Sequence, residues 1–198
     1  MKKLVILFSL VLILATGCGT RMGTPTKKVE EFLGKYQSMD SEVLAQLDSV
    51  ISSDTSMSDE QKKEYQGLME KQYQNLSYKI KSEEINGDNA TVLVEIEVYD
   101  YASSISKSKE YYNEHRDEFI DDDKNNDTDD NNTVGDLIED VAVETVKFID
   151  YKIKQLKNVT DKVKHEIKFY LTKNEDNEWV LDDITDVDRQ KIHGLYEG

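Results

Sequence analysis

The chain has little of three things that stabilise or attach many proteins: cysteine, proline and long apolar runs. Its 198 residues include one cysteine and one proline. A single cysteine excludes an internal disulfide, so burial and hydrogen bonds alone must stabilise the fold. Beyond the first residues, no apolar run approaches the roughly 20 residues that a helix needs to span a bilayer. We therefore expect membrane attachment, if present, to use another kind of anchor.

Positive charge is also scarce, with 25 Lys and Arg against 41 Asp and Glu and a formal net charge of −16. An acidic chain repels nucleic acid, so we expect no nucleic-acid partner. His115 and His193 have no second histidine at ligand spacing, which argues against a zinc site. The sequence contains no Gly-x-Ser-x-Gly, phosphate loop or dinucleotide fingerprint, and we expect no cofactor.

The N-terminus carries the strongest local signal. Lys2 and Lys3 precede an apolar run over residues 4–14, which ends in small residues. This arrangement is typical of a signal peptide, predicted over residues 1–17. The next residue, Cys18, completes "ATGC", which resembles the lipobox of bacterial prolipoproteins.

The lipobox resemblance implies that Cys18 receives a diacylglycerol and becomes the first residue of the mature chain. More than one acyl chain on one residue gives stable anchoring. We therefore expect a location at the cell membrane, on its extracytoplasmic face, with residues 18–24 as lipidated cysteine and flexible tether. The Lys- and Asn-rich composition fits a Gram-positive surface lipoprotein, and an outer-membrane destination stays open.

Residues 25–198 are predicted to form a single α+β domain. Apolar residues three and four positions apart indicate three helices before any strand: the first begins at Pro25, the second is capped by Ser41, and the third starts at Ser58. A capped short helix ending at Gly194 is predicted near the end of the sequence.

Two hairpins are predicted between these helices. The apolar period changes to two in residues 77–85 and 90–101, which an Asn-Gly-Asp turn separates, and again in residues 163–171 and 179–184. The expected product is a curved four-stranded antiparallel sheet with one buried face, against which the N-terminal helices pack.

A two-helix insertion is predicted between the hairpins, over about residues 103–159. Its first helix covers residues 103–120, and its second starts near Val134 and carries an apolar stripe to Leu156. The sequence leaves open whether this insertion covers the sheet or stands away from it.

Three stretches, "TPTKKVEEFLGKYQSMD", "NGDNATVLVEIEVYDY" and "WVLDDITDVDRQKIHG", carry a family resemblance. Together they resemble the cone-shaped fold of the nuclear transport factor two-like and cystatin-like superfamily, and in particular its small Gram-positive lipoproteins. The superfamily includes enzymes that use a buried Asp or Tyr inside the cone and many members without catalysis. The resemblance therefore implies a pocket inside the cone, although the insertion at residues 103–159 departs from the basic fold.

The candidate pocket lies on the apolar faces of the two central strands. Its predicted lining is Val94, Ile96, His165, Ile167 and Phe169. An imidazole on such a face can act as a base, a ligand or a pH switch, but it is more often a core or rim group.

The acidic run after residue 120 provides a weak calcium candidate. Asp121 and Asp123, or Asp127 and Asp129, have the alternate spacing of an EF-hand loop. Neither set has the glycine at the sixth position or the glutamate at the twelfth. A solvated loop is the favoured interpretation, and no other metal site is expected.

Three functions remain open from the sequence. The leading hypothesis is a non-catalytic interaction or accessory module with a protein partner at the cell surface, whose contact surface includes the insertion. Tyr99, Tyr101, Tyr111 and Tyr112 cluster where the second strand enters the insertion; they suit an interface, but coverage of the protein's own core is the favoured interpretation. The alternative is a lipoprotein that binds an unidentified small molecule in the cone pocket. The third, an enzyme of isomerase or dehydratase type, requires a buried carboxylate or tyrosine beside His165.

Overall fold

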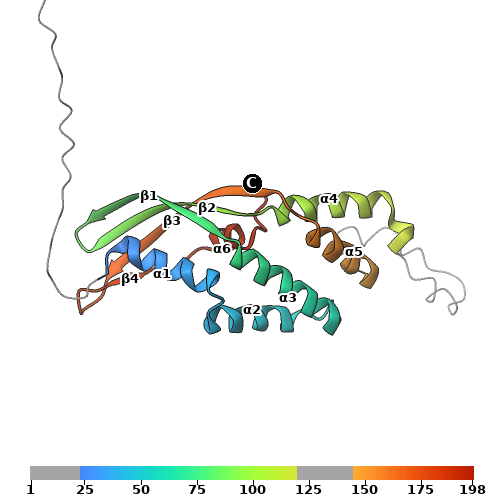
Figure 1. Ribbon diagram of the computed structural model, residues 1–198, viewed down its shortest axis with the longest axis horizontal. Helices are drawn as coiled ribbons and strands as arrows, with labels where there is room; N and C mark the ends of the chain where they lie inside the picture. Colours follow the sequence, from blue (N-terminus) through green and yellow to red (C-terminus); the bar gives the residue numbers. More distant parts are fainter. Residues whose placement is uncertain (1–22, 120–144) are drawn as a thin grey trace, which may run out of the picture.

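A four-stranded antiparallel sheet and six α-helices make up the part of the chain that the computed structural model describes, residues 23–119 and 145–198. Helices α1 and α6 lie against one face of the sheet, and the pairs α2–α3 and α4–α5 extend beyond one of its ends (Figure 1). In chain order the elements are α1 (Pro25–Gln37), α2 (Ser41–Ser53), α3 (Asp59–Gln74), β1 (Ser77–Asn86), β2 (Asn89–Tyr99), α4 (Tyr101–Glu114), the 3-10 helix η1 (Arg116–Phe119), α5 (Val146–Lys157), β3 (Lys162–Lys173), β4 (Trp179–Leu181) and α6 (Asp186–His193). The predicted α+β class, with a two-helix insertion between two hairpins, is confirmed.

Polar caps determine where the first three helices begin. The Thr24 side chain accepts a hydrogen bond from the backbone of Lys27 and places Pro25 in the first turn, and Ser58 forms a capping box with Gln61 at the start of α3. The prediction that Ser41 caps α2 is wrong by one residue. The cap is the preceding Asp40, because its carboxylate accepts from the Glu42 backbone and leaves Ser41 free to be helical.

The sheet has the strand order β1-β2-β3-β4. In its central ladder, Val94 lies opposite Ile167 and Ile96 lies opposite His165. The alternate residues of β2 from Val92 to Val98 point to the inner face and are fully buried, which confirms the predicted alternation. The outer face is mixed and polar, as at Glu95, which accepts from two lysines.

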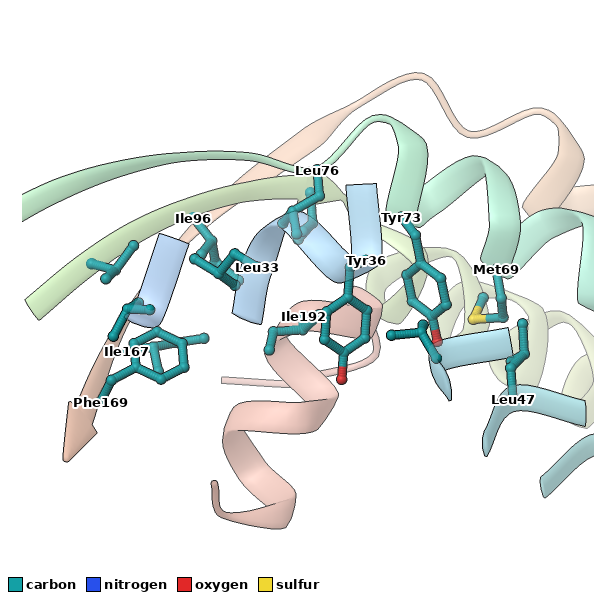
Figure 2. Close-up of a cluster of buried hydrophobic side chains, with 14 of the residues drawn as sticks. Leu33, Tyr36, Leu47, Met69, Tyr73, Leu76, Ile96, Ile167, Phe169 and Ile192 are labelled. Atoms are coloured by element: carbon teal, nitrogen blue, oxygen red, sulfur yellow. The ribbon is translucent and has the colours of Figure 1, made fainter. Parts of the chain in front are cut away.

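The hydrophobic core continues from the sheet into the helices (Figure 2). Its labelled side chains run from Phe169, Ile167 and Ile96 at the sheet, past Leu33 and Ile192, to Tyr36, Tyr73, Met69 and Leu47 at the helical end. Leu33 of α1 and Ile192 of α6 are fully buried, so they connect the two ends of the core.

The insertion stands beyond the sheet and packs on α3. Its helices α4 and α5 meet through an aromatic cluster that includes Tyr112, Phe119 and Phe148. The Gln61 side chain of α3 donates to the Val146 backbone oxygen, which attaches α5 to the N-terminal helices. Tyr112 therefore packs within the chain, which agrees with the favoured interpretation of the tyrosine cluster.

Helix α5 of the insertion has a cap of its own. Thr145 has an extended backbone and caps α5 by accepting from the Phe148 backbone, so the helix starts at Val146 and the prediction of one continuous helix from Val134 is wrong. Residues 134–144 lie outside the described residues, as do Cys18 and the calcium candidates near Asp121.

Candidate functional site

An apolar cleft of about 180 Å³ lies between α2, α3 and α6. Half of its lining side chains are buried, whereas Gln46 and Val50 of α2 and Arg189 of α6 are exposed. Val50 is 70% exposed, so the cleft opens to solvent along this helix. The buried wall residues are Tyr36, Val43, Leu47, Ile51, Met69 and Tyr73.

Next to the cleft-lining residues Tyr73 and His193, a buried polar contact joins α3 to the end of β2. Gln72 is fully buried, and its amide both donates to the Tyr99 carbonyl oxygen (3.1 Å) and accepts from the Tyr99 backbone N–H (2.9 Å). Gly194 lies against this amide with a positive φ of 71°, and its carbonyl accepts from Ala102 at 2.8 Å. A Cβ at this position would contact the Gln72 amide and the Tyr99 oxygen, so only glycine fits.

A hydrogen bond joins Tyr73 of α3 to His193 of α6, and both residues line the cleft. The Tyr73 hydroxyl and His193 Nδ1 are 2.9 Å apart, and the ring centroids of Tyr36 and Tyr73 are separated by 5.1 Å in an edge-on arrangement. Burial, together with the nearby Arg189 guanidinium, lowers the pKa of His193 to about 4. The imidazole is therefore neutral at neutral pH, and burial also raises the pKa of the Tyr73 hydroxyl.

Arg189 is the one permanently charged residue that lines the cleft. Its guanidinium also acts on Tyr36, whose pKa burial raises and Arg189 lowers, which indicates that the cation lies near this end of the cleft. The side chain is 44% exposed and approaches Asp186 at 3.8 Å, while its Nη2 donates to the Ile184 oxygen at 3.3 Å.

The predicted cone residues lie elsewhere. Val94, Ile96, Ile167 and Phe169 share the inner face of the sheet, each at most 1% exposed, and they do not line the cleft. The structure thus brings these four together, but as members of the packed core.

His165 shares the inner face but lies near its rim, where it is half-buried. Its ring meets Tyr196 edge-on with centroids 5.5 Å apart, and its buried Nε2 has no hydrogen-bond partner. Burial lowers the pKa of His165, and the Lys191 ammonium acts in the same direction. A tyrosine therefore lies beside His165, as the enzyme hypothesis requires, but the tyrosine is only partly buried.

Carboxylates are missing from the buried polar groups. Within residues 23–119 and 145–198, the buried polar side chains are Gln61, Gln72 and Ser108. The same residues contain no group of three or more His, Cys, Asp or Glu that could hold a metal ion. In addition, no helix of this part of the chain is long and apolar enough to cross a membrane.

Sequence reasoning missed the cleft and its Tyr73–His193 pair. The two residues are 120 positions apart, and each was assigned only to its own helix. The one available signal was that Tyr36 and Tyr73 both fall on inward helix faces, which brings polar hydroxyls into a core.

Comparison with known proteins gives one likeness. No family model and no curated protein matches the chain. Among solved structures, a candidate lipoprotein from Bacillus subtilis, YcdA, is similar to 89% of this chain with 18% sequence identity and a TM-score of 0.36. The match covers 48% of that protein, so the chain spans about half of its length.

Proposed function

We propose that the chain is an extracytoplasmic lipoprotein, anchored to the membrane through Cys18, that acts by binding a small molecule in the cleft between α2, α3 and α6. The signal-like residues 1–17 and the lipobox-like cysteine support the location. The observation that carries the binding function is a largely apolar cleft whose buried walls end in an exposed rim at Val50.

The same cleft supports binding better than catalysis. Its candidate acid–base pair is Tyr73 and His193, but the Tyr73 hydroxyl has a raised pKa and the lining residues include no carboxylate. The isomerase or dehydratase hypothesis therefore has no buried carboxylate among the described residues, and the tyrosine beside His165 is only partly buried. A protein partner at the cell surface remains a prediction of the sequence, and the binding proposal does not depend on it.

The anchor is tested by membrane fractionation of cells that express the natural protein or Cys18→Ala. The natural protein should sediment with the membranes, and Cys18→Ala should be released into the soluble extracytoplasmic fraction. Equal amounts of both proteins in the membrane fraction would contradict lipid anchoring through this cysteine.

The binding site is tested with N-phenyl-1-naphthylamine, an uncharged apolar probe whose fluorescence rises in a dry site. We expect saturable binding to the natural protein and at least about tenfold weaker binding to Val50→Trp, because the indole would fill the rim of the cleft. The matched control is Ser49→Trp, at an exposed neighbouring position of α2 that does not line the cleft. Equal binding by both variants would show that the probe binds elsewhere.

A further inference from the structure

We propose that the ligand of the cleft is a small amphipathic anion whose carboxylate-like head group binds Arg189 and whose apolar tail lies along α2 toward Val50. This inference rests on the proposed binding function and adds the chemical class of the ligand. It is carried by the distribution of charge and apolar surface along the cleft.

The charge at the head end is positive in a protein that is otherwise strongly acidic. The chain has a formal net charge of −16, yet Arg189 is the only permanently charged residue in the lining. Its neighbour Asp186 is 98% exposed and 3.8 Å away, a solvated pair that holds the guanidinium weakly. Because a guanidinium has five donors and one is used by the Ile184 oxygen, others remain for a carboxylate.

The two ends of the cleft differ in polarity, which gives the ligand a direction. Arg189 lies near Tyr36 and His193, as its effect on the pKa values of both residues indicates. At the other end, the pKa of Tyr65 is raised, mainly by burial and also by the nearby Asp54 carboxylate. An anionic head group is therefore attracted to the Arg189 end and repelled from the Tyr65 end.

The tail end also opens toward a second, mostly apolar cavity. Val50, Ile51 and Tyr65 line both the cleft and a second cavity of about 220 Å³, which lies between α2 and α5. Ile149 and Ile153 of α5 contribute the opposite wall of this second cavity. The lining of this cavity also includes Asp54, Ser56 and Lys152, but most of it is apolar, so an alkyl tail that leaves the cleft at Val50 has apolar side chains beside it.

The test uses three probes with the same eight-carbon tail: octanoate, 1-octanol and octyltrimethylammonium. Each competes with N-phenyl-1-naphthylamine for the natural protein at low ionic strength. Octanoate should displace the probe at a concentration about tenfold lower than octanol, because a charge-assisted hydrogen bond contributes enough free energy for a tenfold difference in affinity. Octyltrimethylammonium should require the highest concentration of the three. The variant Arg189→Gln should weaken the binding of octanoate to the level of octanol, and it should leave the binding of octanol unchanged.

The matched control is Arg116→Gln, which removes the same charge from an exposed residue of η1 outside the cleft. This variant should still bind octanoate more tightly than octanol. An equal loss of that preference in Arg189→Gln and Arg116→Gln would overturn the inference. If the uncharged probe binds but octanoate and octanol compete equally, or neither competes, the anion inference is wrong and the binding function stands. If the uncharged probe itself does not bind, the proposed function fails as well.

Discussion

The sheet end and the helical end of the core contain similar side chains but differ in packing. At the sheet end, Val94 and Ile167 lie opposite each other in a continuous ladder and are fully or almost fully buried. At the helical end, Leu47 and Met69 are also buried, yet they line an open cleft. The difference follows from how the backbones are joined.

A hydrogen-bonded ladder sets the spacing between neighbouring strands, so side chains on one face meet at fixed distances and fill the space. Helix α2 has no such ladder, and its main neighbour is α3. Side chains alone determine its distance from the rest of the molecule, which leaves room beside it. Among the described residues, the cleft therefore lies at the helical end of the core.

The largest expected effect compares the same substitution at both ends. Leu33→Ala removes a fully buried side chain between the sheet and α1 and should lower the free energy of unfolding by about 4 kcal/mol. Leu47→Ala, in the cleft wall, should cost about 2 kcal/mol because the side chain already borders open space. Urea denaturation measures both, and equal losses would contradict the difference in packing.

The next prediction concerns the contact of Gly194 with Gln72 and Tyr99, which connects α6, α3 and the end of β2. Gly194→Ala should lower the free energy of unfolding by about 3 kcal/mol, because the methyl group strains the positive φ and displaces the Gln72 amide from Tyr99. The control Gly87→Ala has a similar positive φ with open space around it and should cost about 1 kcal/mol. A loss of the same size at both glycines would mean that the Gln72 contact contributes nothing.

The smallest effect is the contribution of His193, at the helical end, to the pH dependence of stability. The pKa of His193 is lowered from 6.5 to about 4 in the folded protein. The unfolded chain therefore takes up a proton first as the pH falls, and stability decreases between about pH 6.5 and 4. Because the side chain is only partly buried, we expect a loss of about 2 kcal/mol.

The groups that face His193 are Tyr73 from α3, Tyr36 from α1 and Arg189 from its own helix. The measurement compares urea denaturation of the natural protein and His193→Gln across this pH range, so that the carboxylates, common to both, cancel. The variant should lose less stability on acidification, and parallel curves would contradict the lowered pKa.

Local patterns predicted most of the fold because each depends on neighbours in the sequence. The alternation from Val92 to Val98 identified the buried face of β2, and Ser58 marked the start of α3. The errors were local as well: Asp40 replaces Ser41 as the cap of α2, and α5 begins at Val146 because Thr145 caps it.

The candidate site was beyond local patterns. The predicted pocket followed the inner face of the sheet, but apolar alternation identifies buried residues without saying whether space remains between them. The cleft instead depends on how α2, α3 and α6 approach one another, and its hydrogen bond joins Tyr73 to His193 across 120 positions. The buried amide of Gln72 gave no signal either, because glutamine is ordinary on a helix surface.

The position of Ile192 and Gly194 has a consequence for the order in which the protein acquires its structure. Ile192 fills the middle of the core, and Gly194 completes the contact between α3 and the end of β2. All other described helices and strands precede α6 in the chain. A nascent polypeptide from which α6 is still missing therefore has an unfilled core. We therefore expect stable folding to wait for translation of this last helix, since domains generally fold as units.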